Sequence, residues 1–80
     1  MSVEQDVKSY IIENLGWDRD ASELTDDYPL IERGALDSMG IFKLVTHLET
    51  KYDIDVEDEE LVPKHFGTIS SIASLIRSKT

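Results

Sequence analysis

One segment of the sequence, Gly34 to Gly40, places a serine where it could do chemistry. Ser38 directly follows Asp37 and precedes an amphipathic run from Ile41 to Tyr52, so it stands at the mouth of a predicted helix. A serine at this position can be a helix cap and nothing more. It can also be a covalent attachment point for an anionic group, because unpaired amides and the helix macrodipole favour negative charge there.

A serine nucleophile of the hydrolase type is disfavoured by the neighbouring residues. The nucleophile elbow has glycine two positions before and two positions after the serine. Gly40 fills the second position, but Leu36 occupies the first. His47 and His65 have no orienting partner evident in the sequence, so it offers no catalytic triad. We therefore expect that the protein is not an enzyme and has no catalytic residue.

The acidic run that begins at Asp53 is compared with a calcium-binding loop. Asp53, Asp55 and Glu57 have the alternation of such a loop, which also needs glycine at its sixth position and glutamate at its twelfth. Those places hold Asp58 and Lys64. We therefore expect no dedicated metal site, and we interpret the run as a solvated, repulsive segment that attracts divalent ions weakly.

Length and composition restrict the class of protein. The 80 residues are expected to form a single domain, residues 1–80, with one modest core and no cysteine to crosslink it. A net charge of −9 disfavours nucleic acid as a partner and favours proteins with basic patches, although the acid could serve solubility alone. No apolar run approaches the ~18–20 residues of a membrane span, so we expect a cytoplasmic protein.

The first predicted helix runs from Val3 to Leu15. Ser2, with Gln5 three residues later, fits a capping box, and Gly16 is a suitable stop. Its expected buried residues are Val3, Val7, Tyr10, Ile11 and Leu15, with Trp17 covering the end of the core.

The following segment, residues 18–36, has no helical period and is expected to be an ordered loop. Pro29 keeps Tyr28 out of helical geometry. Loops of this length in compact domains are usually functional or pinned to the core. A short helical turn is expected from Ala21 to Leu24, and the expected pins are Leu24, Leu30 and Ile31.

The second predicted helix begins at Ser38 with Asp37 as its N-cap. Met39 and Phe42 lie off its apolar face and three residues apart, so they can form an exposed strip beside Ser38. In the alternative interpretation, Met39 packs on the loop and Phe42 lies at the edge of the core. The apolar face comprises Ile41, Leu44, Val45, Leu48 and Tyr52, and the strip continues with Thr46 and Glu49.

Two further helices are predicted after the acidic run. Pro63 interrupts any long helix, which leaves one short helix around Glu59 to His65. Thr68 caps a last helix from Ile69 to about Ser78. Its core face is Ile69, Ile72, Ala73 and Ile76, with Leu75 near the edge. The sum is an all-α, small four-helix bundle with three main helices, a short third helix and a long first loop.

The second helix and the residues before it resemble a known family. Leu36-Asp37-Ser38-Met39 and the apolar positions that follow resemble the Asp-Ser-Leu motif and second helix of acyl carrier proteins. The resemblance covers nearly the whole chain, because the long first loop, the acidic stretch before a short third helix and the last helix opening at Thr68 occupy corresponding places.

The resemblance implies a carrier in which a phosphopantetheinyl transferase moves 4′-phosphopantetheine from coenzyme A onto the Ser38 oxygen. The terminal thiol of that arm would hold an acyl or aminoacyl group as a thioester. By the family pattern, Asp37 caps the helix and helps to engage the transferase and its magnesium ion. The core residues of the second and last helices would line the interior into which some carriers fold their cargo. The positions that family members use to contact enzymes are Met39, Phe42, Lys43, Thr46 and Glu49.

Departures from the family pattern indicate the type of carrier. Fatty-acid carriers usually have further acids after the serine, where this chain has Gly40, Lys43 and Thr50. Peptide synthetase modules usually carry Gly-Gly-x-Ser, which Ala35 to Ser38 do not match. The Leu-Asp-Ser form is also similar to free-standing aminoacyl carriers, including the D-alanyl type.

We therefore expect a monomeric, discrete carrier in a specialised acyl or aminoacyl pathway. An activating ligase would load it, and a downstream synthase or transferase would receive its cargo. The alternative is a small acidic interaction module without a prosthetic group, in which Ser38 is a plain cap.

Overall fold

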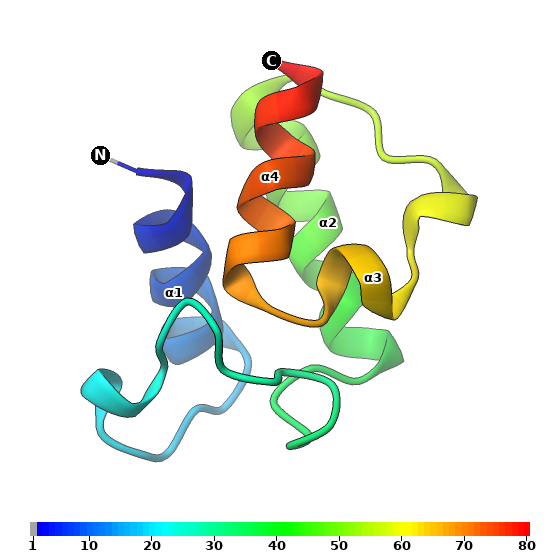
Figure 1. Cartoon of the computed structure of the whole chain (residues 1–80). Helices are drawn as coiled ribbons and strands as arrows, with labels where there is room; N and C mark the ends of the chain where they lie inside the picture. Colours follow the sequence, from blue (N-terminus) through cyan, green and yellow to red (C-terminus); the bar gives the residue numbers. More distant parts are fainter. Residues whose placement is uncertain (1) are drawn as a thin grey trace.

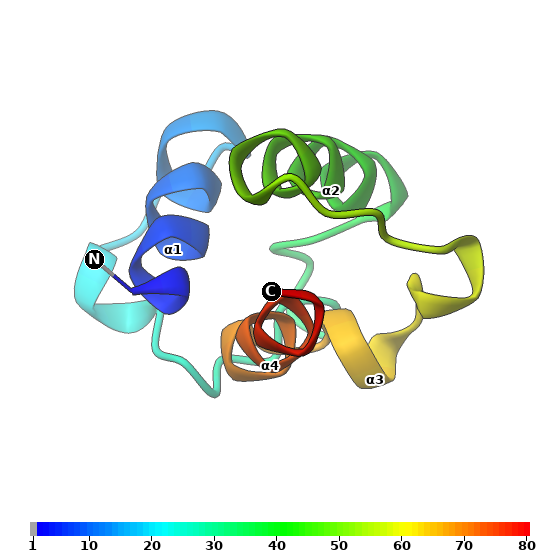
Figure 2. The ribbon, with the colours of Figure 1, turned by 90° about the horizontal axis from the view of Figure 1, so that it is seen from above.

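Four α-helices and two short 3₁₀ turns form an all-α bundle in the computed structural model, which describes residues 2–80. In Figure 1, α1, α2 and α4 are the long helices; Figure 2 shows α2 on one side of the bundle and α3 with α4 on the other. No strand occurs among residues 2–80, and the predicted fold class is confirmed. The elements are α1 (Val3–Asn14), η1 (Ala21–Glu23), α2 (Ser38–Tyr52), η2 (Asp58–Glu60), α3 (Pro63–Phe66) and α4 (Ile69–Lys79).

Polar caps begin the three long helices where the sequence predicts them. The side chains of Ser2, Asp37 and Thr68 each accept a backbone N–H from three residues further on, at 3.1, 2.7 and 3.1 Å. Each bond satisfies an amide that has no partner inside its helix. The helix ends differ slightly from the prediction. Leu15 is the C-cap of α1 rather than its last residue, and α4 continues one residue past its predicted end.

The predicted short third helix is present, but its bounds differ from the expected Glu59 to His65, because α3 covers Pro63–Phe66 and a separate 3₁₀ turn, η2, precedes it. Pro63 is the first residue of α3 and does not interrupt a helix. At the first position of a helix, a backbone N–H would have no partner within the helix, so the N–H that proline lacks is not missed. The fixed φ of proline also suits the start of a helix. The preceding turn η2 is closed by a capping box, in which the Glu57 N–H donates to Oε1 of Glu60 at 2.9 Å.

The core lies between the three long helices and also includes Leu36, at the end of the long loop, which was not among the predicted pins. Phe66 of α3 is fully buried although it was not among the predicted core residues, and Leu75 of α4 is buried although it was placed near the edge. The predicted stripe residues Val3, Tyr10, Leu15, Ile41 and Tyr52 are only partly buried against this core. Its buried members are Val7, Ile11, Leu24, Leu30, Leu36, Leu44, Val45, Leu48, Phe66, Ile69, Ile72, Ala73, Leu75 and Ile76.

The long loop between α1 and α2 is ordered and pinned to the core, as predicted. Leu24 and Leu30 are buried in the core, and Ile31 packs partly buried against it. The Leu30 N–H donates to the Gly67 carbonyl at 2.8 Å, and the Ser70 N–H donates to a loop carbonyl at 2.9 Å. These bonds connect the loop to the junction of α3 and α4, so the chain enters α2 from a fixed direction.

A polar cluster joins α1 to the far end of α2. Oδ1 of Asp6 accepts from Nζ of Lys51 at 2.9 Å, and Oδ2 accepts from the Tyr52 hydroxyl at 3.1 Å. His47 stacks on Tyr10, with ring centroids 4.5 Å apart, and its Nε2 lies 3.5 Å from Asp6. Burial would raise the pKa of Asp6, but the bonds from Lys51 and Tyr52 outweigh it, and the pKa lies below its ordinary value of 3.8.

Candidate functional site

The residues around Ser38 divide into an anchor, a cap and an exposed hydroxyl. Leu36 is buried and fixes the end of the long loop to the core. Asp37 is exposed and has extended backbone geometry, and its Oδ1 accepts the Gly40 N–H at 2.7 Å. Ser38 is the first residue of α2 and is exposed. The cap bond is made by Asp37, so the Ser38 side chain is not needed for it.

Gly40 allows the first turn of α2 to lie close to its surroundings. It is buried, and a Cβ atom placed on it would lie 3.3 Å from Oδ1 of Asp37 and 3.4 Å from Cδ2 of Leu36. The next nearest atom is Cδ1 of Leu15, at 3.7 Å. A side chain at this position would therefore press on the cap and on the anchor. From the sequence, Gly40 is interpreted only as a position where an acid is absent, whereas the structure gives it a packing role.

The predicted strip of α2 is exposed where it begins. Met39 and Phe42 expose 64% and 65% of their surface, so the alternative that Met39 packs on the loop and Phe42 on the core is wrong. Lys43 is exposed and makes no ion pair among residues 2–80. Thr46 is also exposed, and its hydroxyl donates to the Phe42 carbonyl at 3.0 Å.

Glu49 differs from the other predicted strip residues. It is half-buried, and its Oε2 accepts the Val56 N–H at 3.0 Å. This bond holds the acidic segment against the last turn of α2. The structure therefore brings Met39, Phe42, Lys43 and Thr46 together on one exposed face, and it gives Glu49 an internal partner.

Two hollows lie on either side of the first turn of α2. An apolar hollow of about 240 Å³ is lined by Ser38, Ile41, Phe42 and Leu61. On the other side, a more polar hollow of about 220 Å³ is lined by Asn14, Leu15, Gly34, Ala35, Asp37, Met39, Gly40 and Lys43. Ser38 thus lies beside an apolar surface that an attached group can contact. No local pattern in the sequence indicates that Leu61 is part of this surface.

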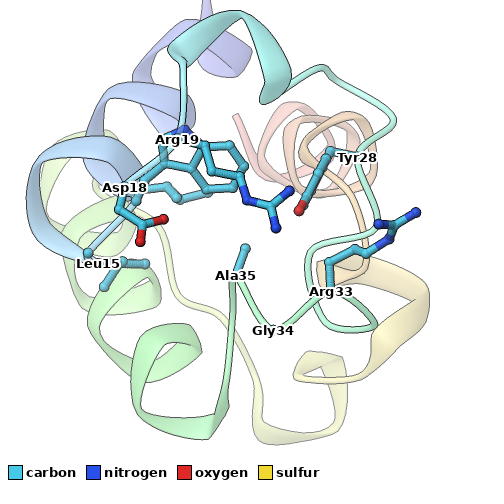
Figure 3. Close-up of a pocket in the computed structure, with 10 residues that line it drawn as sticks. Leu15, Asp18, Arg19, Tyr28, Arg33, Gly34 and Ala35 are labelled. Carbon is cyan, nitrogen blue, oxygen red and sulfur yellow. The ribbon is translucent and has the colours of Figure 1, made fainter.

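A third hollow lies further along the loop (Figure 3). Arg19 extends over it toward Tyr28, whose ring meets Trp17 edge-to-face at a centroid distance of 5.2 Å. Arg33 lies at its edge, next to Gly34 and Ala35. None of the site residues expected from the sequence lines this hollow, but it shares Leu15, Gly34 and Ala35 with the polar hollow beside α2.

The geometry gives no support to catalysis by Ser38. His47 is nine residues further along the same helix, which separates the two by about 13 Å along the axis. Its ring stacks on Tyr10 and lies beside Asp6 of α1.

In residues 2–80, no three His, Asp or Glu side chains gather in an arrangement that could hold a metal ion. Within the same residues, no helix has both the length and the apolar character needed to cross a membrane.

Comparison with known proteins identifies the family. Residues 5–76 match the family model described as "Phosphopantetheine attachment site". The chain is 32% identical over 79 residues to the acyl carrier protein of Chlamydia caviae, covering 99% of this chain and 97% of the relative. It is 34% identical over 73 residues to the acyl carrier protein of Thermotoga maritima, covering 91% and 85%.

A solved chain from a structure described as "Crystal structure of FAD-dependent dehydrogenase" superposes with a TM-score of 0.77 at 30% identity. The match covers 88% of this chain and 97% of that chain. Carriers of the matched family work with a phosphopantetheinyl transferase and with synthases or ligases. The chain belongs to the phosphopantetheine-attachment family of acyl carrier proteins: it is a carrier, not an enzyme, and its cofactor is covalently attached 4′-phosphopantetheine.

Proposed function

We propose that Ser38 is the residue to which the phosphopantetheine is attached. The observation that carries this proposal is an exposed hydroxyl at the first position of α2, directly after a capping aspartate that makes the 2.7 Å bond itself. The first amides of a helix have no partner within it and favour a phosphodiester nearby. When bound, the group supplies a terminal thiol that holds an acyl or aminoacyl group as a thioester.

The alternative, in which Ser38 is only a cap, loses its support from this geometry. Asp37 accepts the Gly40 N–H and leaves Ser38 without a capping bond of its own. We therefore favour attachment at Ser38, with Asp37 holding the start of the helix and presenting a carboxylate to the transferase and its magnesium ion.

The pathway we propose is a specialised acyl or aminoacyl pathway rather than housekeeping fatty-acid synthesis. The argument rests on Lys43 and Thr50, both exposed on α2 where fatty-acid carriers usually have acids. Gly40 no longer contributes to it, since packing explains that residue. We also propose that residues 1–80 form one monomeric carrier domain that works in the cytoplasm.

The partners we propose are a phosphopantetheinyl transferase, an activating ligase and a downstream synthase or transferase. Met39, Phe42, Lys43 and Thr46 form the exposed face available to them, and Glu49 contributes less because it bonds to Val56. The likeness to a chain in the structure described as that of an FAD-dependent dehydrogenase favours a second candidate. In this candidate the enzyme that acts on the carried group is an FAD-dependent dehydrogenase.

Intact-protein mass spectrometry tests the attachment. The protein is incubated with coenzyme A, magnesium and a broad-specificity phosphopantetheinyl transferase, with a known carrier treated in parallel. We expect one phosphopantetheine increment on the wild type and none on Ser38→Ala. An increment on a folded Ser38→Ala would assign the attachment to another residue, and no increment on the wild type beside a modified control would favour the interaction module.

A further inference from the structure

Only some of the basic residues of this acidic protein form ion pairs. Of the 8 lysines and arginines, five make ion pairs within 4 Å. Among residues 2–80, the three without such a pair are Arg33, Lys43 and Lys64. The five pairs are Lys8–Asp26, Arg19–Glu23, Lys51–Asp6, Arg77–Glu4 and Lys79–Glu60.

Two of these three cations lie near the start of α2. Lys43 lines the polar hollow beside Met39, and Arg33 lines the adjoining hollow along the loop. The two hollows share the lining residues Leu15, Gly34 and Ala35, so Arg33 and Lys43 line neighbouring hollows. We call the surface formed by Arg33, Met39, Phe42, Lys43 and Thr46 the α2 patch.

The part of this patch that lies on α2 contains no acidic residue. From Ser38 to Leu48 the chain has no Asp or Glu, and the first acid of α2 is Glu49, which bonds to the Val56 N–H. Asp37, whose Oδ1 accepts the Gly40 N–H, lies at the edge of the patch, and Glu32 and Asp18 lie near its Arg33 end. Residues 53–60, beyond the other end of α2, contain six acids. The net charge of −9 therefore describes the molecule as a whole but not the surface beside Ser38.

The α2 patch also has an apolar centre, because Met39 and Phe42 each expose about two thirds of their surface. Two exposed large apolar side chains beside the unpaired Lys43, with Arg33 across the adjoining hollow, fit a partner surface with an apolar socket and carboxylates at its rim. Basic groups at such a rim would face Lys43 and Arg33 and would be repelled. Charge complementarity thus selects one kind of partner surface at this end of α2.

We propose that the α2 patch docks on enzymes through an apolar socket that is rimmed by carboxylates. The acidic run 53–60 lies outside this contact, and basic residues of the partner enzyme that face this run orient its approach. This proposal rests on the proposed function, because the patch is placed at Ser38 so that a carried group reaches the enzyme that binds the patch.

Two designed helical peptides test the proposal without knowledge of the natural partner. Both have the same apolar face; in one it is flanked by glutamates and in the other by lysines. Each is titrated into ¹⁵N-labelled protein loaded with phosphopantetheine, and amide shifts are followed by residue. We expect the glutamate-flanked peptide to shift Met39, Phe42 and Lys43, and the lysine-flanked peptide to shift residues 53–60 instead.

Charge variants distinguish the effect of the α2 patch on binding from the effect of the net charge of the molecule. The double variant Arg33→Glu with Lys43→Glu should weaken binding of the glutamate-flanked peptide at the patch about fivefold. Lys64→Glu is the matched control, because it reverses the third unpaired cation on α3, across the bundle from α2 (Figure 2), and it should leave that binding unchanged.

The proposal is overturned if the lysine-flanked peptide binds the wild-type patch as tightly as the glutamate-flanked one. It is also overturned if the double variant and Lys64→Glu weaken binding equally. Loading of Ser38 is measured separately by mass, so a failure of docking on a loaded protein is distinguishable from a failure of the attachment proposal.

Discussion

At the scale of single residues, the two neighbours Asp37 and Ser38 have opposite physical roles. Asp37 makes a 2.7 Å bond to the start of α2 and so contributes to stability. Ser38 is exposed and leaves the cap bond to Asp37. One residue of the pair therefore holds the helix, and the other is free to be modified.

Alanine substitutions separate these roles. Asp37→Ala should lower the free energy of unfolding by about 0.5–2 kcal/mol, because the Gly40 N–H loses its acceptor. Ser38→Ala should change it by less than about 0.5 kcal/mol, as expected of an exposed residue without a structural bond. Urea unfolding followed by circular dichroism measures both. An equal loss in the two variants would mean that Ser38 shares the capping role.

At the scale of the elements, the junction of α3 and α4 leaves no room for a side chain at Gly67. Gly67 ends α3, and its carbonyl accepts the Leu30 N–H from the long loop at 2.8 Å. A Cβ atom on Gly67 would lie 2.6 Å from the carbonyl oxygen of Pro63, closer than any side-chain carbon can approach. The backbone must shift to admit one, and the loop that leads to Ser38 would shift with it.

Gly67→Ala should therefore lower the free energy of unfolding by about 1–3 kcal/mol, the usual range for an overpacked site. Ser70→Ala, at an exposed position in the first turn of α4, is the control and should change it by less than about 0.5 kcal/mol. Thermal and urea unfolding compare the two variants. If Gly67→Ala were as stable as the control, the close contact with Pro63 would be relieved without cost.

The elements that the sequence predicts well are those whose signals are local. The start of α2 follows from one capping aspartate and a helical apolar period, and the exposure of Met39 and Phe42 follows from the same period. The bounds of the third helix are harder to predict, because Pro63 can stop a helix or start one.

The site contains further features that depend on contacts far apart in the chain. The packing role of Gly40 depends on Leu15 of the preceding helix, and the apolar hollow at Ser38 depends on Leu61. The internal bond of Glu49 requires Val56 to return toward α2, which helical spacing alone does not show. These contacts arise only when segments that are far apart in the chain meet, so no local sequence pattern predicts them.

At the scale of the whole molecule, ion pairs and a polar cluster connect the first helix to the other two long helices. Asp6 joins α1 to α2, and Glu4 joins α1 to α4 through two bonds with Arg77, at 2.6 and 2.7 Å. The Arg77 bonds hold the pKa of Glu4 below its ordinary value of 4.5. Both carboxylates stabilise the bundle while they are ionised. The free energy of unfolding should therefore decrease when the pH is low enough to protonate them.

Asp6→Asn should reduce that pH dependence. The pKa of Asp6 is lower in the folded state than its ordinary value of 3.8, so its contribution is present above that pH and is lost as the pH falls through the folded-state value. The free energy of unfolding of the wild type should therefore fall more steeply below about pH 4 than that of the variant.

Urea unfolding between pH 3 and pH 6 measures the two slopes. Glu13→Gln is the control, because Glu13 is exposed on the same helix and makes no ion pair within residues 2–80. It should keep the steeper wild-type decline. Parallel curves for the wild type and Asp6→Asn would show that Asp6 is not a source of the dependence.

The close packing around Gly40 has a consequence for how a carried group finds its reaction partner. Leu15, Leu36 and the Asp37 cap pack around the first turn of α2, so they hold the point of attachment that we propose in place beside the face formed by the α2 patch. Once that face is bound, only the arm itself explores space, and it confines the cargo to a small volume. Tethers of this kind produce effective concentrations in the millimolar range. A carrier built in this way can therefore bind each enzyme weakly, leave quickly and still saturate the active site while it is docked.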